Sequence, residues 1–202
     1  MRTLIIKTSS LGDVLHTLPA VSDAAAQHPE MRFDWVVEEA FAEVPGWHAA
    51  VDEVIPVALR RWRHRPFHVL RLGEPQAAMR QIRQREYDQV IDAQGLMKSA
   101  VMTRLARGPR TGLDRHSARE SLAAYACDRR IPVARNQHAV TRVRQLFAAA
   151  LDYPLPNTRA DYGIKANFTP GQRQPYLVFL HGTTWPTKHW PEPYWVQLTA
   201  MA

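Results

Sequence analysis

The sequence is poor in cysteine and has no long hydrophobic run. Its 202 residues include one cysteine, Cys127, which excludes an internal disulfide and a cysteine-based zinc cluster and fits a reducing cytosol. We expect Cys127 to be a small buried hydrophobic side chain. The apolar run at residues 4–6 ends at Lys7, and no stretch approaches the ~20 residues of a membrane-spanning helix. The sequence therefore predicts a soluble protein without a signal peptide that at most lies on a membrane surface.

Acidic residues are also fewer than basic ones. The chain has 26 lysines and arginines against 19 acidic residues, a formal net charge of +7. This excess predicts anionic partners, namely phosphates, carboxylates, nucleic acid or an acidic membrane surface. Charge alone does not choose among them.

Apolar runs bounded by turn residues alternate with helical patterns along most of the chain. We predict strands at residues 3–7, 33–39, 53–59, 88–94 and 110–113. We predict helices at residues 13–27, 41–51, 74–87, 96–107 and 138–153. Such alternation favours βαβ units, so the predicted fold class is α/β, a Rossmann-like parallel sheet with helices on both faces.

The composition changes near the C-terminal end. Residues 1–160 are predicted to form the N-terminal Rossmann-like domain, and proline, glycine and polar residues predict a linker at 161–175. Residues 176–202 predict a strand, a loop and a helix from about Pro191, which would open a second domain. Because one strand cannot form a sheet, we expect the sequence to be a fragment of a longer protein.

Glycine is scarce where a nucleotide site would need it. The stretch "KTSSLGDVLHTLPA", residues 7–20, lies between a strand and a helix, where N–H groups point at an anion. With Gly12 alone it matches neither the P-loop nor G-x-G-x-x-G. Asp13 in its first helical turn is favoured by pattern as a cap, but at the carboxyl edge of a parallel sheet it could act as a general base. His16, one turn later, could pair with Asp13, or its side chain could pack in the protein or face the solvent.

Basic residues gather at other predicted loops. "LRRWRHRPFH", residues 59–68, places arginines around Trp62 after a strand, which suits bidentate binding of phosphate or carboxylate, or else a solvated loop. Lys98 in a first helical turn opposes the dipole, which an anionic ligand would balance. Arg119 lies in "GLDRHSARES", by itself typical of a solvated surface. "LHGTTWPTKHWP", residues 180–191, suits a diphosphate but lacks a glycine-rich cradle.

Four stretches together resemble one family. They are "MRTLIIKTSSLGDVLHTLPA", "FDWVVEEAFAEVPGWHAAVDEVIPVALRRWR", "YDQVIDAQGLMKSA" and "HGTTWPTKHWPEPYW". The chain closely resembles the ADP-heptose-dependent lipopolysaccharide heptosyltransferases from Met1 to its end, and "KTSSLGDVLHTLPA" with "RRWR" points to type I.

This resemblance implies a GT-B enzyme with two Rossmann-like domains, the N-terminal one binding the acceptor and the C-terminal one the nucleotide-sugar. The implied reaction transfers L-glycero-D-manno-heptose from ADP-heptose to the Kdo residue of Kdo2-lipid A, with inversion at the sugar carbon. No metal, no cofactor beyond the co-substrate ADP-heptose and no nucleic acid are implied. A lipid acceptor also implies a peripheral place on the cytoplasmic face of the inner membrane.

The resemblance assigns roles residue by residue. Asp13 would be the general base, while Thr183, Thr184 and Lys188 would contact the donor. The acceptor-binding residues would be Arg60, Arg61, Arg63, Lys98 and Arg119. His64 stands where many relatives would have lysine, which makes a charge contact there pH-dependent. Most of the donor domain is absent, so the fragment alone is expected to be inactive.

Two alternatives stay open at the level of sequence. One is a sibling glycosyltransferase with a different core acceptor. The other is a non-enzymatic module that binds polyanions or nucleic acid through its +7 charge and the arginine and tryptophan cluster. The second predicts steeply salt-dependent binding to generic polyanions.

Overall fold

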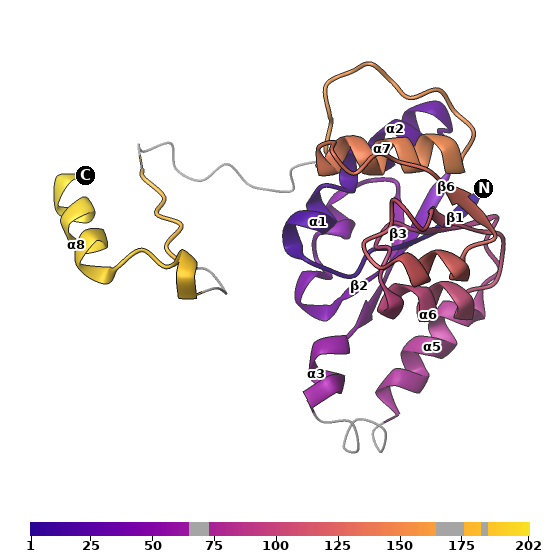
Figure 1. The fold of residues 1–202 in the computed structure, drawn as a ribbon, viewed down its shortest axis with the longest axis horizontal. Coiled ribbons are helices and arrows are strands. Elements are labelled where there is room, and N and C mark those ends of the chain that lie inside the picture. The colour runs from indigo at the N-terminus through magenta and orange to yellow at the C-terminus, as the bar shows by residue number, and fades with distance from the viewer. Residues whose placement is uncertain (65–72, 165–175, 183–185) are drawn as a thin grey trace. The chain divides into compact units, whose positions relative to one another are not determined.

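The computed structural model describes residues 1–64, 73–164, 176–182 and 186–202. The chain divides into two compact units, Met1–Asn167 and Phe168–Ala202 (Figure 1). The boundary lies inside the segment predicted as a linker, residues 161–175. The assignment of residues 1–160 and 176–202 to two domains stays a prediction.

The first unit is built on a six-stranded sheet in the order β3-β2-β1-β4-β5-β6, and every neighbouring pair is parallel. The strands are β1 (Arg2–Ile6), β2 (Arg32–Glu38), β3 (Val51–Val57), β4 (Gln89–Asp92), β5 (Arg110–Leu113) and β6 (Arg129–Ile131). This order reverses between β1 and β4, which is where open α/β sheets bind ligands. The predicted α/β fold class is confirmed.

Helices cover both faces of this sheet (Figure 1). Those on one face are α1 (Leu11–Leu15), α2 (Leu18–Gln27) and α7 (Ala139–Ala150), and α5 (Glu74–Gln84) and α6 (Met97–Leu105) lie on the other. Alternation along β1 explains the two cores, since Ile5 packs with the α2 and α7 side while Leu4 and Ile6 pack with the α5 and α6 side. The short helix α3 (Leu59–His64) follows β3.

Two predicted helices of the first unit differ from the structure. The helix predicted at 13–27 is split into α1 and α2, because Pro19 starts a new helix rather than continuing one. The α-helix predicted at 41–51 is wrong: 3₁₀ turns at Glu39–Phe41 and Pro45–Trp47 replace it, since Pro45 and Gly46 interrupt a regular helix.

In the second unit, the strand predicted from Tyr176 is also wrong for the described residues 176–182, which form no strand. A strand needs a hydrogen-bonded neighbour, and the described part of this unit contains only a 3₁₀ turn, η4 (Pro186–Lys188), and helix α8 (Glu192–Met201). The predicted C-terminal helix is confirmed. None of the helices described has the length and apolar composition to cross a membrane.

Candidate active site

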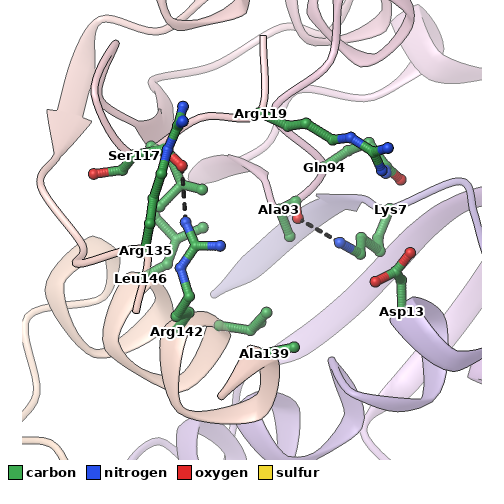
Figure 2. A pocket seen from close by; sticks show the side chains of 12 residues that line it. Lys7, Asp13, Ala93, Gln94, Ser117, Arg119, Arg135, Ala139, Arg142 and Leu146 are labelled. Atoms are coloured by element: carbon green, nitrogen blue, oxygen red, sulfur yellow. Dashed lines mark hydrogen bonds between the residues drawn. The ribbon is translucent and has the colours of Figure 1, made fainter. Parts of the chain in front are cut away.

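A cavity of about 370 Å³ opens at the point where the strand order reverses. Its walls come from the loops after β1 and β4, from α1, from the end of β5 and the segment after it, from the segment after β6, and from α7 (Figure 2). The lining residues are Lys7, Asp13, Ala93, Gln94, Leu113, Ser117, Arg119, Arg135, Ala139, Arg142, Val143 and Leu146. The loops after β1 and β4 are tied together, because Gln94 Oε1 accepts hydrogen bonds from the backbone N–H groups of Thr8 (3.0 Å) and Ser9 (3.1 Å).

Asp13 both caps α1 and faces this cavity. Its Oδ2 accepts hydrogen bonds from Ser10 N (2.9 Å) and Ser10 Oγ (3.0 Å), so the capping role predicted from the pattern is present. Partial burial by itself would raise the pKa of Asp13, but the Ser10 hydrogen bonds and the nearby Lys7 charge lower the pKa below its usual value. The carboxylate is therefore ionised near neutral pH. The His16 ring lies against that of His138, with centroids 5.7 Å apart.

Lys7 is a functional candidate that the sequence interpretation missed. The side chain is 7% exposed, and Nζ donates a hydrogen bond to the carbonyl of Ala93 at 2.9 Å. Burial lowers the pKa of Lys7, while the carboxylates of Asp13 and Asp92 oppose this shift. A lysine directly after a buried strand was the available signal. Figure 2 shows its ammonium group between Ala93 and Asp13.

Three arginines line other parts of the cavity wall: Arg119, Arg135 and Arg142 (Figure 2). Arg142 Nη2 donates to the carbonyl of Ser117 at 2.8 Å, and Arg135 donates to the carbonyl of Ala118. Within the described residues, Arg142 Nε is buried without a hydrogen-bond partner. The lining residues thus include four cationic side chains, those of the three arginines and Lys7, and a single carboxylate, that of Asp13. This excess of positive charge suits an anionic ligand.

Of the predicted acceptor residues, the structure brings Arg119 into this cavity with Asp13. Lys98 lies close by without lining it, and Nζ donates to Ser9 Oγ at 2.6 Å. Burial lowers the pKa of Lys98, and the charge of Glu38 opposes that shift. The buried carboxylate of Glu38 therefore already balances part of the charge that we had expected a ligand to balance.

The arginines of α3 lie outside the cavity lining. Arg61 is held by Glu39, with Nη2 to Oε2 at 3.0 Å, and by Glu74, with Nη1 to Oε2 at 2.8 Å. The Arg60 guanidinium lies 5.5 Å from the centre of the Phe41 ring, while Arg63 is exposed.

The other aromatic and donor-site predictions lie apart from this cavity. Trp62 packs partly against the core under α5 and donates Nε1 to Glu74 Oε2 at 3.1 Å, so its ring serves packing. Lys188 is exposed at the end of η4 in the second unit. Thr183 and Thr184 lie outside the described residues. In the part of the chain that the structure describes, no group of three or more His, Cys, Asp or Glu side chains could hold a metal ion.

The chain matches known proteins over almost its whole length. The family described as glycosyltransferase family 9 (heptosyltransferase) matches residues 76–202. The Pseudomonas aeruginosa lipopolysaccharide heptosyltransferase 1 is 59% identical over 203 residues, which cover 98% of this chain and 57% of that relative. The lipopolysaccharide heptosyltransferase 1 of Escherichia coli strain K12 is 51% identical, covering 100% of this chain and 64% of the relative.

A solved structure agrees with these relatives. The E. coli heptosyltransferase WaaC with ADP-2-deoxy-2-fluoro heptose superposes with a TM-score of 0.94 at 51% identity, covering 100% of this chain and 65% of that one. The same enzyme with ADP superposes equally well, with a TM-score of 0.94. The chain thus has the fold of part of a GT-B glycosyltransferase, and it spans less than two thirds of the length of these relatives.

Proposed function

The chain belongs to glycosyltransferase family 9, the heptosyltransferases, and from this premise we propose that it acts as lipopolysaccharide heptosyltransferase I of inner-core synthesis. The reaction is transfer of L-glycero-D-manno-heptose from ADP-heptose to the Kdo residue of Kdo2-lipid A, with inversion. One observation carries the proposal: an ionised carboxylate, Asp13, faces a cavity whose other charged lining residues are all cations, at the reversal point of the sheet.

Asp13 is the general base in this proposal. Both hydrogen bonds from Ser10 end on Oδ2, which leaves Oδ1 to take the proton of the acceptor hydroxyl. A carboxylate of low pKa is a weak base, but the hydroxyl becomes far more acidic as its oxygen bonds to the electron-poor sugar carbon. Proton transfer therefore comes late, and a positioned base contributes typically ~10²–10⁴-fold to the rate.

The cations select an anionic acceptor. Arg119, Arg135 and Arg142 supply planar guanidinium groups that match the carboxylate of Kdo and the phosphates of lipid A. Lys98, whose Nζ lies at Ser9 in the loop after β1, adds positive charge near the cavity, and Arg60 and Arg63 of α3 would contact more distant anionic groups of the acceptor. Arg61 contributes least to acceptor binding, because Glu39 and Glu74 already bind its guanidinium.

ADP-heptose is the co-substrate, and no metal or other cofactor takes part. The E. coli relative was solved with ADP and with ADP-2-deoxy-2-fluoro heptose, which supports this choice of donor. Thr183, Thr184 and Lys188 would contact the diphosphate, and a lysine there offsets the negative charge that develops on the departing ADP. The acceptor's lipid places the enzyme peripherally on the cytoplasmic face of the inner membrane.

Replacing Asp13 by Asn in the whole protein tests the proposal. The amide oxygen keeps the hydrogen bonds from Ser10 but cannot take a proton at neutral pH, so we expect kcat to fall ~10²–10⁴-fold with little change in thermal stability. The measurement is ADP release from ADP-heptose with a deacylated Kdo2-lipid A analogue. The matched control is Ser10→Ala, which removes one hydrogen bond and keeps the carboxylate. Near-normal turnover in Asp13→Asn would reduce Asp13 to a helix cap.

A further inference from the structure

A second cavity lies beside the candidate active site and shares one residue with it. The volume of this cavity is about 390 Å³, and its lining residues are Arg115, His116, Ser121, Leu122, Tyr125 and Arg135. Arg135 also lines the candidate active site. All the other lining residues come from the segment between β5 and β6, which includes the 3₁₀ helix η3 (Ser121–Ala126).

The helix η3 carries its large apolar side chains on the outside. Leu122 is 65% exposed and Tyr125 is 60% exposed. The small residues Ala123 and Ala126 of the same helix are buried against Ala100 of α6. A helix that buries alanines and exposes leucine and tyrosine presents an apolar surface that this unit itself leaves uncovered.

Arginines border this apolar surface. The Arg130 guanidinium lies 5.1 Å from the centre of the Tyr125 ring and donates Nε to the carbonyls of Ala124 and Cys127. Arg115 and Arg135 line the cavity. Among the residues that the structure describes, none of these three arginines has a carboxylate within ion-pair distance. Their positive charges are therefore available to an anionic surface.

Nearby carboxylates are engaged elsewhere. Asp114 Oδ1 accepts hydrogen bonds from the backbone N–H groups of His116 (3.1 Å) and Ser117 (2.8 Å). Glu120 Oε2 accepts one from Met97 N at the start of α6. These carboxylates shape the loop and its junction with α6, and neither of them lines the second cavity.

We propose that this surface, defined by Arg115, Leu122, Tyr125, Arg130 and Arg135, docks the protein on an anionic lipid bilayer. The arginines meet lipid phosphates, while Leu122 and Tyr125 enter the interface between headgroups and acyl chains. Apolar and aromatic side chains with a basic rim are what interfacial binding requires. The inference rests on the proposed function, in which the acceptor is a lipid. A bilayer bound at this surface would hold that acceptor next to the candidate active site, because Arg135 lines both cavities.

The test is sedimentation of the whole protein with vesicles that contain no acceptor, made either of phosphatidylglycerol with phosphatidylcholine or of phosphatidylcholine alone. We expect binding to the anionic vesicles only. Leu122→Ser should weaken it roughly tenfold, because a largely exposed leucine loses its burial in the bilayer. Arg115→Gln should weaken it about fivefold, which corresponds to the contribution of one basic residue near such a surface.

Matched controls lie on α5, no residue of which lines the second cavity. Met79→Ser removes an apolar side chain that is 40% exposed, and Arg83→Gln removes an exposed arginine; both should bind vesicles as the parent does. Equal vesicle binding by Leu122→Ser, Arg115→Gln and the parent would overturn the proposal. The proposal would also be overturned if inorganic phosphate abolished vesicle binding while the Leu122→Ser variant bound vesicles normally. Such a result would indicate a simple anion site.

A failure of docking is distinguishable from a failure of the proposed function. Leu122→Ser should keep full turnover on the soluble, deacylated acceptor, because Leu122 lies outside the candidate active site. Vesicle binding that depends on Leu122 supports docking whether or not turnover is found. Turnover without any vesicle binding rejects docking and leaves the proposed function standing.

Discussion

At the scale of residues, two carboxylates at the same edge of the sheet have opposite environments. Asp92 is 2% exposed, and its oxygens accept hydrogen bonds from Gln94 N, Gly95 N and Ser99 Oγ. Burial raises the pKa of Asp92, whereas the hydrogen bonds from Ser10 and the Lys7 charge overcome partial burial and lower the pKa of Asp13. Asp92 is thus committed to shaping the loop after β4, and Asp13 keeps one oxygen for chemistry.

The low pKa of Asp13 sets the expected pH dependence. The ionised form is the active base, so activity is lost only as pH falls through the pKa of Asp13 in the folded protein, which the Ser10 hydrogen bonds and the Lys7 charge hold below its usual value. We expect the acid limb of kcat/KM to lie below the usual range of an aspartate, about pH 4, and activity to stay level from there toward neutral pH. Tryptophan fluorescence at each pH checks that the protein remains folded. An acid limb well above the usual range of an aspartate would contradict the assignment of the base to Asp13.

Two of the residues predicted from the sequence line the candidate site, and other lining residues were missed for a physical reason. Asp13 and Arg119 were predicted, and both line the cavity, because each lies in a loop or first turn after a strand. Arg135 and Arg142 were missed, since their roles depend on hydrogen bonds to the carbonyls of Ala118 and Ser117, contacts that no local pattern encodes.

At the scale of elements, five of the six strands of the first unit were predicted and the edge strand was not. The strands β1 to β5 each carry buried apolar or small residues, and their pattern was visible in the sequence. The edge strand β6, with the sequence RRI, has two exposed arginines and no such pattern, so it was not predicted. Its place in the sheet comes from pairing with β5.

The position of α3 depends on Glu38 at the end of β2. Glu38 is 2% exposed, and its Oε1 accepts a hydrogen bond from Arg60 N at 3.1 Å, while its Oε2 is buried without a partner among the described residues. This carboxylate caps the helix that carries Arg60 and Arg63.

We therefore expect Glu38→Ala to raise the acceptor KM about fivefold with kcat nearly unchanged, since a cap contributes ~1 kcal/mol. Glu38→Gln keeps an oxygen for the Arg60 N–H and should restore most of the affinity. Steady-state kinetics with the soluble acceptor measures both, and Glu86→Ala, on the exposed pair with Arg107, is the control. An unchanged KM in Glu38→Ala would show that the placement of α3 does not matter for the acceptor.

At the scale of the whole molecule, the first unit contains its own cores. Apolar clusters fill both faces of the sheet, and the last described residue before the boundary, Ile164, forms a β-bridge with His48. The residues that line the candidate active site all belong to this unit.

A chain ending at Ile164 should therefore fold cooperatively, with a thermal midpoint within a few degrees of that of the 202-residue chain. Because every residue that lines the candidate site lies in this shorter chain, calorimetric titration with the deacylated Kdo2-lipid A analogue should give the same affinity for both chains. ADP-heptose should yield no product with either, and a random oligonucleotide at physiological salt should not compete. Loss of the acceptor affinity on shortening would mean that the second unit helps to form this site.

The position of Arg135 between two cavities has a thermodynamic consequence. The Arg135 guanidinium cannot form its strongest ion pair with an anion in each cavity at the same time. If it moves toward an anion in one cavity, the electrostatic environment of the other cavity changes. Occupants of the two cavities are therefore coupled, and by linkage each changes the other's affinity by the same factor. A bilayer would then act as an allosteric effector of acceptor binding, and the sign of that coupling would show whether the two ligands compete for Arg135 or share it.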